Sequence, residues 1–267
     1  CVPIGMGKDV FCLLSGGKDS VVATHITMRA AALHMQKVPI VVYLDTGTGL
    51  EEQRDYVERV CDRFGWQLWT LRTHEDYEEL VKEHGFPGPG QHGTMYNRLK
   101  RRQLERLAAR VKDAHYYTGV RASESLNRME NMGRVQEEGE GKWTWHAPIY
   151  GWEDKQVWEY IERHDIPPNP QWSKGGRAAD CFCGAYASRE ELIGLMADYP
   201  KKAEWIEDLE EELDRDDKKG LWGWGGSDET ALRAAMAEKD EAQMTLCSTC
   251  SLPDLATDGG DEEPGED

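Results

Sequence analysis

Apolar and polar residues alternate along the first 120 residues in a way that predicts strands and helices in turn. Short apolar runs predict buried strands, and the segments between them have helical periodicity. Because strands alternating with helices build parallel sheets with right-handed crossovers, we expect a doubly wound α/β fold. The strands are expected at Asp9–Leu14, Pro39–Leu44, Trp66–Leu71 and Ala114–Val120, and the helices at Ser20–Gln36, Glu51–Phe64, Asp76–His84 and Thr94–Lys112.

The pattern after residue 150 is helical and rich in loops. A Pro- and Gly-rich stretch at Asp165–Asp180 predicts a long loop. We therefore expect an α/β domain at residues 1–150, a helical subdomain at 151–253 that carries most of the cysteines, and an acidic, disordered tail at 254–267. The further helices are expected at Glu153–His164, Ser188–Asp198, Pro200–Asp217 and Asp228–Lys239.

Composition limits the classes of function. The chain has 267 residues and a net charge of −18, from 50 acids and 32 bases. Acidity spread along a chain keeps a protein soluble and argues against general affinity for polyanions. The longest apolar run, Val38–Leu44, is too short to span a bilayer, and no signal peptide is evident. Seven cysteines without a regular framework are typical of reduced thiols and metal ligands, so we expect a cytoplasmic protein.

A candidate phosphate-binding loop follows the first predicted strand. Two glycines let the backbone turn tightly and bring its N–H groups close to phosphate oxygens, and the N-terminus of the next helix adds partial positive charge. Lys18 supplies a full positive charge. A Gly-Gly pair alone would be typical of an ordinary strand-to-helix turn, but the complete string at this position favours phosphate binding. The loop consists of Ser15, Gly16, Gly17, Lys18, Asp19 and Ser20.

Two further strand ends bring polar groups to the same edge of the sheet. Asp45, Thr46 and Gly47 follow the second strand, where a carboxylate could bind Mg²⁺ on a triphosphate. A turn or a helix entry is the alternative interpretation of these residue types. Gly119 and Arg121 follow the fourth strand, and an arginine fork suits phosphate or sulfate. Since ligands of parallel α/β sheets bind at the carboxyl ends of the strands, we expect one nucleotide site at this edge.

Several of these segments resemble known families. Ser15–Ser20 resembles the PP-loop of ATP pyrophosphatases, which split ATP between its α- and β-phosphates. Gly119–Arg128 resembles the G-x-R-x-x-E-S-x-x-R element of the phosphoadenosine phosphosulfate reductase family, and Ala147–Trp152 and Asn169–Cys181 resemble later elements of that family. The resemblance implies that ATP with Mg²⁺ binds to the loop and to the two further strand ends. The expected catalytic residues are Lys18, Asp45 and Arg121.

The chain departs from the sulfonucleotide reductases at several positions. Those enzymes usually carry Phe and Ala where Gly17 and Lys18 stand, and their substrate has no pyrophosphate to release. Met95 and Tyr96 occupy the positions of a Cys-Cys pair in the iron–sulfur reductases, and no Cys in a Glu-Cys-Gly context is present. In these features the chain is closer to the ATP pyrophosphatases of DNA phosphorothioation and, more loosely, to the tRNA thiolases.

Four cysteines form a candidate metal site. Their spacing, C-x-C followed by C-x₂-C, suits a tetrahedral zinc ion or an iron–sulfur cluster. The family resemblance at Cys181 favours a [4Fe–4S] cluster, with zinc as the alternative. Cys12, in a predicted strand, and Cys61, on a predicted helix, are expected to be structural. The candidate ligands are Cys181, Cys183, Cys247 and Cys250.

A basic strip interrupts the acidic background. Residues 98–134 contain 10 bases and 4 acids. The solvated face of an amphipathic helix explains such a strip equally well, but the contrast with the rest of the chain also suits a phosphate-rich substrate. The candidate substrate-binding residues are Lys100, Arg101, Arg102, Arg121, Ser125 and Arg128.

Together these patterns and the family resemblance imply an enzyme that adenylates an acceptor with ATP, releases pyrophosphate, and so prepares the acceptor for sulfur insertion. We expect nucleic acid as the acceptor and a partner such as a cysteine desulfurase as the sulfur donor. Three alternatives remain open: a sulfonucleotide reductase, an adenylyltransferase of the FAD-synthetase type, and a non-catalytic subunit that senses nucleotide.

Overall fold

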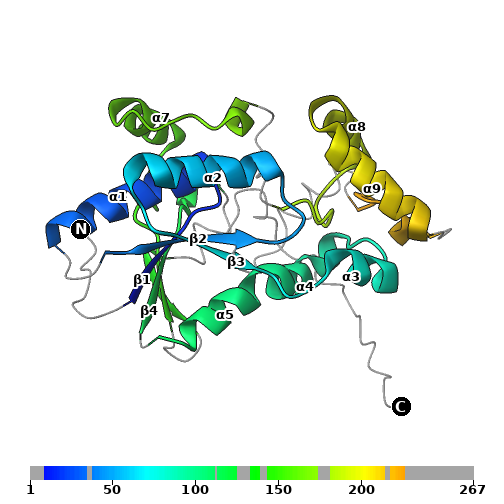
Figure 1. Ribbon diagram of the computed structural model, residues 1–267, viewed down its shortest axis with the longest axis horizontal. Coiled ribbons are helices and arrows are strands. Elements are labelled where there is room, and N and C mark those ends of the chain that lie inside the picture. Colours follow the sequence, from blue (N-terminus) through cyan, green and yellow to red (C-terminus); the bar gives the residue numbers. More distant parts are fainter. Residues whose placement is uncertain are drawn as a thin grey trace, which may run out of the picture.

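A parallel sheet lies at the centre of the computed structural model, which describes residues 9–34, 38–111, 113–124, 133–138, 143–173, 181–213 and 217–225 (Figure 1). In this part of the chain six strands form one sheet in the order β3-β2-β1-β4-β6-β5. All neighbours are parallel except β5, which runs antiparallel to β6. The strands are β1 (Asp9–Leu13), β2 (Ile40–Asp45), β3 (Leu68–Arg72), β4 (Ala114–Tyr117), β5 (Val135–Glu138) and β6 (Trp143–His146).

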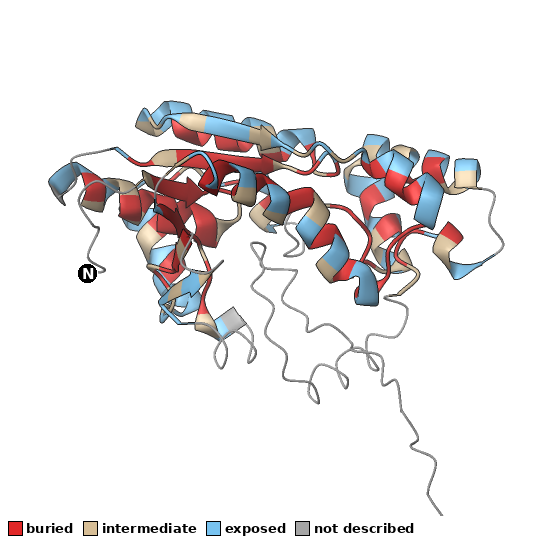
Figure 2. Cartoon of the chain, turned by 90° about the horizontal axis from the view of Figure 1, so that it is seen from below, coloured by how far each residue is buried: buried red, intermediate tan, exposed pale blue. Residues whose placement is uncertain are grey.

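Helices cover both faces of the sheet, as the predicted doubly wound α/β fold requires. On one face lie α1 (Lys18–His34), α2 (Glu51–Phe64) and α7 (Asp154–Arg163), whose apolar side chains share one core with those of β1 and β2. On the other face, α5 (Arg102–Ala108) packs on a second set of buried strand residues. Buried residues are concentrated in the sheet, while the outward sides of the helices are exposed (Figure 2).

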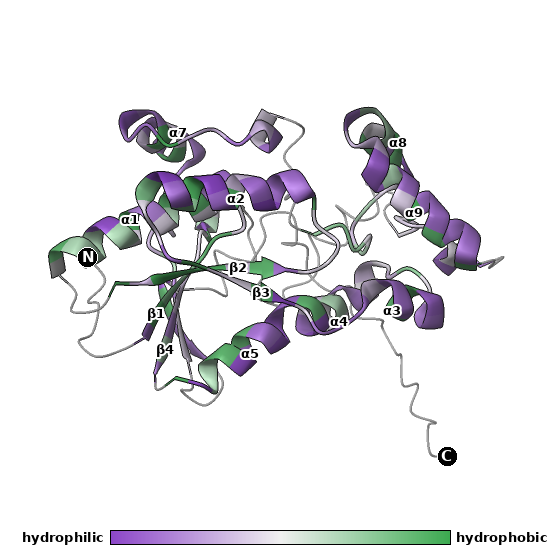
Figure 3. Cartoon of the chain, in the orientation of Figure 1, coloured by the Kyte–Doolittle hydropathy of each residue, from purple (hydrophilic) through white to green (hydrophobic). Residues whose placement is uncertain are grey.

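Local sequence explains where individual helices begin and end. Asp76 caps α3 (Tyr77–His84) by accepting hydrogen bonds from the backbone N–H groups of Glu78 and Glu79. The helix α2 has acids in its first turn and ends at Gly65, whose φ of 66° lies in the left-handed region. Most of the α2 ribbon is coloured as hydrophilic, whereas the β2 strand beneath it is coloured as hydrophobic (Figure 3). Such a pattern is expected of a helix that packs one face on a sheet.

A second core lies beside the sheet and joins distant parts of the chain. Here α3 and α4 (His92–Tyr96) pack with α8 (Arg189–Asp198) and α9 (Pro200–Leu213). The C-terminal helices therefore rest on helices from the first hundred residues. The domain division at residue 150 stays a prediction, but α7, which follows it, packs on α1 within the core of the sheet.

Several predicted elements differ in detail. The helix expected at Thr94–Lys112 is α4, a π-helical turn η2 (Asn97–Arg101) and α5 in succession. The strands β5 and β6 were not expected. Shorter turns are η1 (Pro89–Gln91), η3 (Ala122–Glu124), η4 (Pro170–Ser173) and η5 (Lys218–Gly220).

The helix predicted at Asp228–Lys239 and the acidic tail lie outside the described residues. Among the helices that are described, none has the length and apolar character that a membrane crossing requires.

Candidate nucleotide-binding site

The predicted phosphate loop lies between β1 and α1, at the carboxyl end of β1. Gly16 has a φ of +86°, which favours glycine, and a Cβ atom at this position would lie 2.9 Å from Cδ of Gln53. Within the loop, the Ser20 hydroxyl donates to the carbonyl oxygen of Gly17 (2.8 Å), and the Gly17 N–H donates to Oγ of Ser15 (3.4 Å). The loop is thus a tight turn that enters the first turn of α1.

Three side chains from elsewhere hold the carbonyl oxygens of this loop. Gln53 donates to the carbonyl of Ser15, and both Asn169 Nδ2 (3.1 Å) and Trp172 Nε1 (2.9 Å) donate to the carbonyl of Gly16. Asn169 also donates to Gln53 (2.8 Å), so these side chains form one network. The segment that begins at Asn169 therefore fixes the shape of the loop. In the sequence, only its resemblance to a family element had drawn attention to this segment. Gln53 was missed, because a helical glutamine carries no local signal of such a role.

Four charged side chains meet at the start of α1. Lys18 Nζ lies 3.1 Å from Asp19 Oδ2 and 2.8 Å from Asp154 Oδ1. Arg121 places Nε 2.8 Å from Asp19 Oδ1 and Nη2 3.1 Å from Asp154 Oδ1. The Arg121 side chain is 5% exposed, so its charge is held in a largely buried setting. The structure thus brings together three of the predicted site residues and adds Asp154, which sequence reasoning missed.

Gly119 allows the end of β4 to approach this cluster closely. A Cβ atom at Gly119 would lie 2.5 Å from the carbonyl carbon of Asp19 and 2.7 Å from Cα of Ser20. Arg121 Nη1 also donates to Ser123 Oγ (3.1 Å). The predicted substrate-binding residues Ser125 and Arg128 lie outside the described residues.

Asp45, expected to bind Mg²⁺, ends β2 and begins a polar turn. Its Oδ1 accepts a hydrogen bond from the Gly47 N–H (3.0 Å), and its Oδ2 lies 3.1 Å from Nε of Arg72. Gly47 has a φ of +76°, which favours glycine. Thr46 and Thr48 are buried, and their hydroxyl oxygens lie 3.0 Å apart. The residues therefore form the turn that was the alternative interpretation, while the carboxylate still lies at the carboxyl edge of the sheet.

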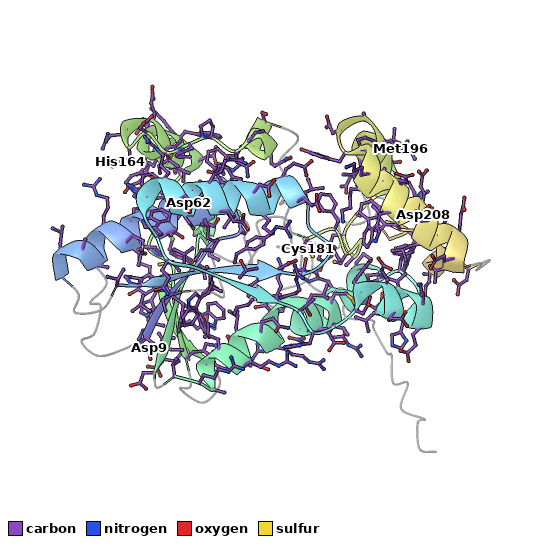
Figure 4. The ribbon with its side chains drawn as sticks, in the orientation of Figure 1. Asp9, Asp62, His164, Cys181, Met196 and Asp208 are labelled. Atoms are coloured by element: carbon purple, nitrogen blue, oxygen red, sulfur yellow. The ribbon has the colours of Figure 1, made fainter. Side chains whose placement is uncertain are left out.

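The first cysteine pair lies next to this turn. Thr48 donates its hydroxyl to Sγ of Cys181 at 3.6 Å and accepts a hydrogen bond from the backbone N–H of Phe182 at 3.1 Å. Figure 4 shows Cys181 near the carboxyl end of β2, on the side of α8 and α9. The hydrogen bond with Cys181 and burial raise the pKa of the Cys183 thiol.

Only the first cysteine pair of the predicted metal site falls within the described residues. Cys247 and Cys250 lie outside the described residues, and no group of three metal-binding side chains occurs within the described ones. Cys12 and Cys61 are buried in the sheet core, where both were expected to be structural.

The basic strip differs from its prediction. Lys100, expected on the surface, is only 4% exposed and lies in the π-helical turn η2. Arg101 Nε lies 3.0 Å from Glu105, and Arg101 also pairs with Glu138. Arg102 pairs with Glu75. Arg101 and Arg102 therefore each pair with acids, which is closer to the alternative of an ordinary helix face than to an open basic groove.

Fold, loop and charged cluster together define a nucleotide-binding α/β protein, and comparison with known proteins names its family. The profile of the phosphoadenosine phosphosulfate reductase domain matches residues 9–191. The chain belongs to this family of enzymes, within the adenine nucleotide alpha-hydrolase-like superfamily.

The curated relatives have low sequence identity to the chain, and the chain covers only part of their length. The chain is 30% identical over 227 residues to an uncharacterised protein of Methanocaldococcus jannaschii, covering 81% of this chain but 46% of that protein. It thus spans about half the length of that relative. A phosphoadenosine 5'-phosphosulfate reductase of Xylella fastidiosa is 27% identical over 187 residues, covering 66% of this chain and 72% of the reductase.

Two solved structures align with the chain at low sequence identity. The phosphoadenylyl-sulfate reductase of Candida auris aligns with a TM-score of 0.47 and 17% identity, over 64% of this chain and 80% of that one. The U34-tRNA thiolase of Methanococcus maripaludis, solved with its [4Fe–4S] cluster, aligns with a TM-score of 0.43 and 15% identity, over 80% of this chain and 74% of that one.

Proposed function

We propose that the chain is an ATP pyrophosphatase that adenylates an acceptor, forming AMP on the acceptor and free pyrophosphate, in preparation for sulfur insertion. The observation that carries the proposal is the complete phosphate loop with its two cations. Gly16 and Gly17 allow a tight turn at the N-terminus of α1, and Lys18 and Arg121 meet beside it. A loop that retains its lysine suits a substrate whose pyrophosphate must be held as it leaves.

The proposed chemistry is a displacement at the α-phosphorus. An acceptor oxygen attacks this atom, the bond from the α-phosphorus to the bridging oxygen of the β-phosphate breaks, and the electron pair leaves with pyrophosphate. The acceptor proton passes to solvent or to a base. Lys18, Arg121 and the helix N-terminus stabilise the charge that develops on pyrophosphate. Asp45 is the residue proposed to hold Mg²⁺, which would neutralise part of the triphosphate charge.

Sulfur chemistry is proposed at the cysteine pair. The thiols fit such a role because Thr48 joins Cys181 to the turn after β2, so a sulfur site and the nucleotide site share one edge of the sheet. We propose that Cys181 and Cys183, with Cys247 and Cys250, hold a [4Fe–4S] cluster, or zinc as the alternative. When bound, a cluster would supply a site for an activated sulfur atom, donated by a partner such as a cysteine desulfurase.

Replacing the loop lysine tests the proposal. Lys18→Ala is expected to abolish ATP-dependent pyrophosphate release while the protein remains folded, since the Lys18 side chain lies at the surface of the cluster and Arg121 still pairs with Asp19. The control is Lys155→Ala, which removes an exposed lysine of α7 and should release pyrophosphate at the parent rate. A folded Lys18→Ala protein with parental turnover would exclude the site.

The main alternative is a sulfonucleotide reductase, which the Xylella fastidiosa relative favours by its name. Such an enzyme would release a 3'-phosphorylated or plain AMP and sulfite, with a thiol as reductant, and no pyrophosphate. Incubation of the parent with ATP and, separately, with a sulfonucleotide distinguishes the two reactions by their products.

We further propose nucleic acid as the acceptor, as in DNA phosphorothioation. Arg101 and Arg102 stand on the strip that precedes Arg121 in the chain, but each already pairs with a glutamate, so a polyanion would have to compete for them. Reversing both to Glu should weaken nucleic-acid binding and reduce the slope of its salt dependence by about one counterion per lost phosphate contact. Equal binding by parent and double variant, or no binding by the parent at any salt, would favour a small-molecule acceptor.

A further inference from the structure

The cations of the phosphate loop are already occupied by two carboxylates that differ in position. Asp19 belongs to the loop itself, and its side chain is 10% exposed. Asp154 comes from the start of α7, and its side chain is 57% exposed. One oxygen of Asp154, Oδ1, lies 2.8 Å from Lys18 Nζ and 3.1 Å from Arg121 Nη2. Asp154 therefore bridges both cations from the solvent side, and it alone of the two carboxylates is half exposed.

The charges of this cluster cancel. Lys18 and Arg121 carry two positive charges, and Asp19 and Asp154 carry two negative charges. The hydrogen bond from Lys18 lowers the pKa of the Asp154 carboxyl below its usual range, which agrees with an ionised side chain at neutral pH. A polyphosphate entering this cluster meets no net positive charge until one carboxylate withdraws.

Asp154 is the carboxylate that can withdraw. Its exposure allows water to replace Lys18 and Arg121 as partners, whereas Asp19 is enclosed and keeps the Arg121 contact at 2.8 Å. The other oxygen of Asp154 accepts a hydrogen bond from Trp158 Nε1 (3.0 Å), one turn further along α7, which retains the side chain at the mouth of the cluster.

We propose that Asp154 is a positioning residue that pairs with Lys18 and Arg121 in the nucleotide-free protein. When a nucleotide binds, its phosphates replace Asp154 as the partners of these two cations. The proposal rests on the proposed function, because it assumes that the loop binds the triphosphate. Asp154 then acts in two directions. It weakens binding of the polyphosphate by competing for the cations, and it speeds release of pyrophosphate by returning to them.

A variant that lacks the Asp154 charge should bind pyrophosphate more tightly, whereas an ordinary active-site mutation weakens binding. Asp154→Asn removes the competing charge and the repulsion of the bound anion, so inorganic pyrophosphate should bind about tenfold more tightly, on the scale of one unit charge a few ångströms from the phosphates in a partly solvated site. Turnover should fall, since tighter product binding slows release, and KM for ATP should fall with it. A purely structural role for Asp154 would instead weaken binding.

The experiment is a calorimetric titration of the full chain with inorganic pyrophosphate, beside steady-state kinetics with ATP. The variants are Asp154→Asn, Asp154→Ser as a second neutral replacement, and Asp154→Glu, which keeps the charge and should bind as the parent does. Glu159→Gln is the matched control, because Glu159 lies on the same helix, is 53% exposed and pairs with Lys155 instead of the loop. It removes one negative charge without touching the cluster.

Tighter pyrophosphate binding by both neutral variants, with unchanged binding by Glu159→Gln, supports the proposal. Unchanged or weaker binding by the neutral variants, when the parent binds, overturns the proposal and leaves the proposed function intact. If neither the parent nor any variant binds pyrophosphate or ATP, the proposed function falls and the role of Asp154 with it. Thermal unfolding of each variant verifies that the comparison is made between folded proteins.

Discussion

Gly119→Ala is a substitution for which the structure predicts a large effect from one added methyl group. The added Cβ would lie 2.5 Å from the carbonyl carbon of Asp19 and 2.7 Å from Cα of Ser20. Carbon atoms in contact prefer about 3.5 to 4.0 Å, so the two segments would have to separate by about 1 Å. Both atoms belong to the backbone of α1, so no side-chain rotation relieves the overlap. The following residues Val21 and Val22 are fully buried in the sheet core and resist the shift.

We expect Gly119→Ala to lower the free energy of unfolding by about 2 to 3 kcal/mol, the range in which overpacking of a closed site falls. Gly194→Ala is the matched control, since the same methyl group placed within α8 would meet nothing within 4 Å. Alanine is the better helix former, so this variant should gain about 0.5 to 1 kcal/mol. The same chemical change is thus predicted to lower the free energy of unfolding at Gly119 and to raise it at Gly194.

Urea unfolding of the three proteins measures both effects, and equal slopes against urea would show that the denatured states are comparable. Pyrophosphate titration adds a local readout, because a 1 Å shift of the loop should weaken phosphate binding even where the protein stays folded. The reasoning is refuted if the free energy of unfolding of Gly119→Ala lies within about 0.5 kcal/mol of that of the parent and the variant binds pyrophosphate equally well. Gly119 would then not approach α1 as closely as the structure shows.

Two further predictions concern pH and metal. Burial lowers the pKa of His25, whose Nδ1 lies 2.9 Å from the Tyr160 hydroxyl, to about 4. Below pH 6.5, His25 therefore binds a proton in the unfolded chain but stays neutral in the folded protein, so the contribution of His25 to the free energy of unfolding is complete above pH 6.5 and declines as pH falls towards 4. Between pH 8 and 5, the free energy of unfolding of His25→Gln, measured in urea, should fall by about 2 kcal/mol less than that of the parent. Equal decreases in the two proteins would contradict this assignment. Protein prepared without oxygen should contain about four iron atoms per chain by elemental analysis, whereas stoichiometric zinc without iron would replace the cluster by a structural zinc site.

Of the strands that sequence patterns predicted, β1, β2 and β4 are largely buried, and only β3 is a partly exposed edge strand. β1 and β2 are continuous apolar runs because helices cover them on each side, and such runs are visible without a partner. β5 (Val-Gln-Glu-Glu) and β6 (Trp-Thr-Trp-His) were missed for the opposite reason. β5 is an exposed edge strand with acids, and β6 is only four residues long, so neither provides a run long enough to recognise.

The phosphate loop was recognisable because its function depends on consecutive residues, whereas its support depends on the fold. Ser15 to Ser20 form one string, and their turn geometry is local. Gln53, Asn169 and Asp154 reach the loop from separations of 38 residues and far more, and each is a common residue type on a helix or in a turn. The burial of Lys100 was missed for a different, local reason. The π-helical turn moves the register of a helix, and a helical pattern with a period of 3.6 residues cannot anticipate that shift.

The half of the chain after residue 150 contributes to the site from two directions, although the division there remains a prediction. The start of α7 brings Asp154 to Lys18, and the segment that follows α7 brings Asn169 and Trp172 to the carbonyl of Gly16. Cys181 then contacts Thr48 in the neighbouring turn. Since each of these contacts holds a loop at the carboxyl edge of the sheet, the first 150 residues alone would retain the loop sequence and Gln53 but would lack Asp154, Asn169 and Trp172. The phosphate loop and the cysteine pair are therefore both held at the carboxyl edge of the sheet by contacts between the two parts of the chain.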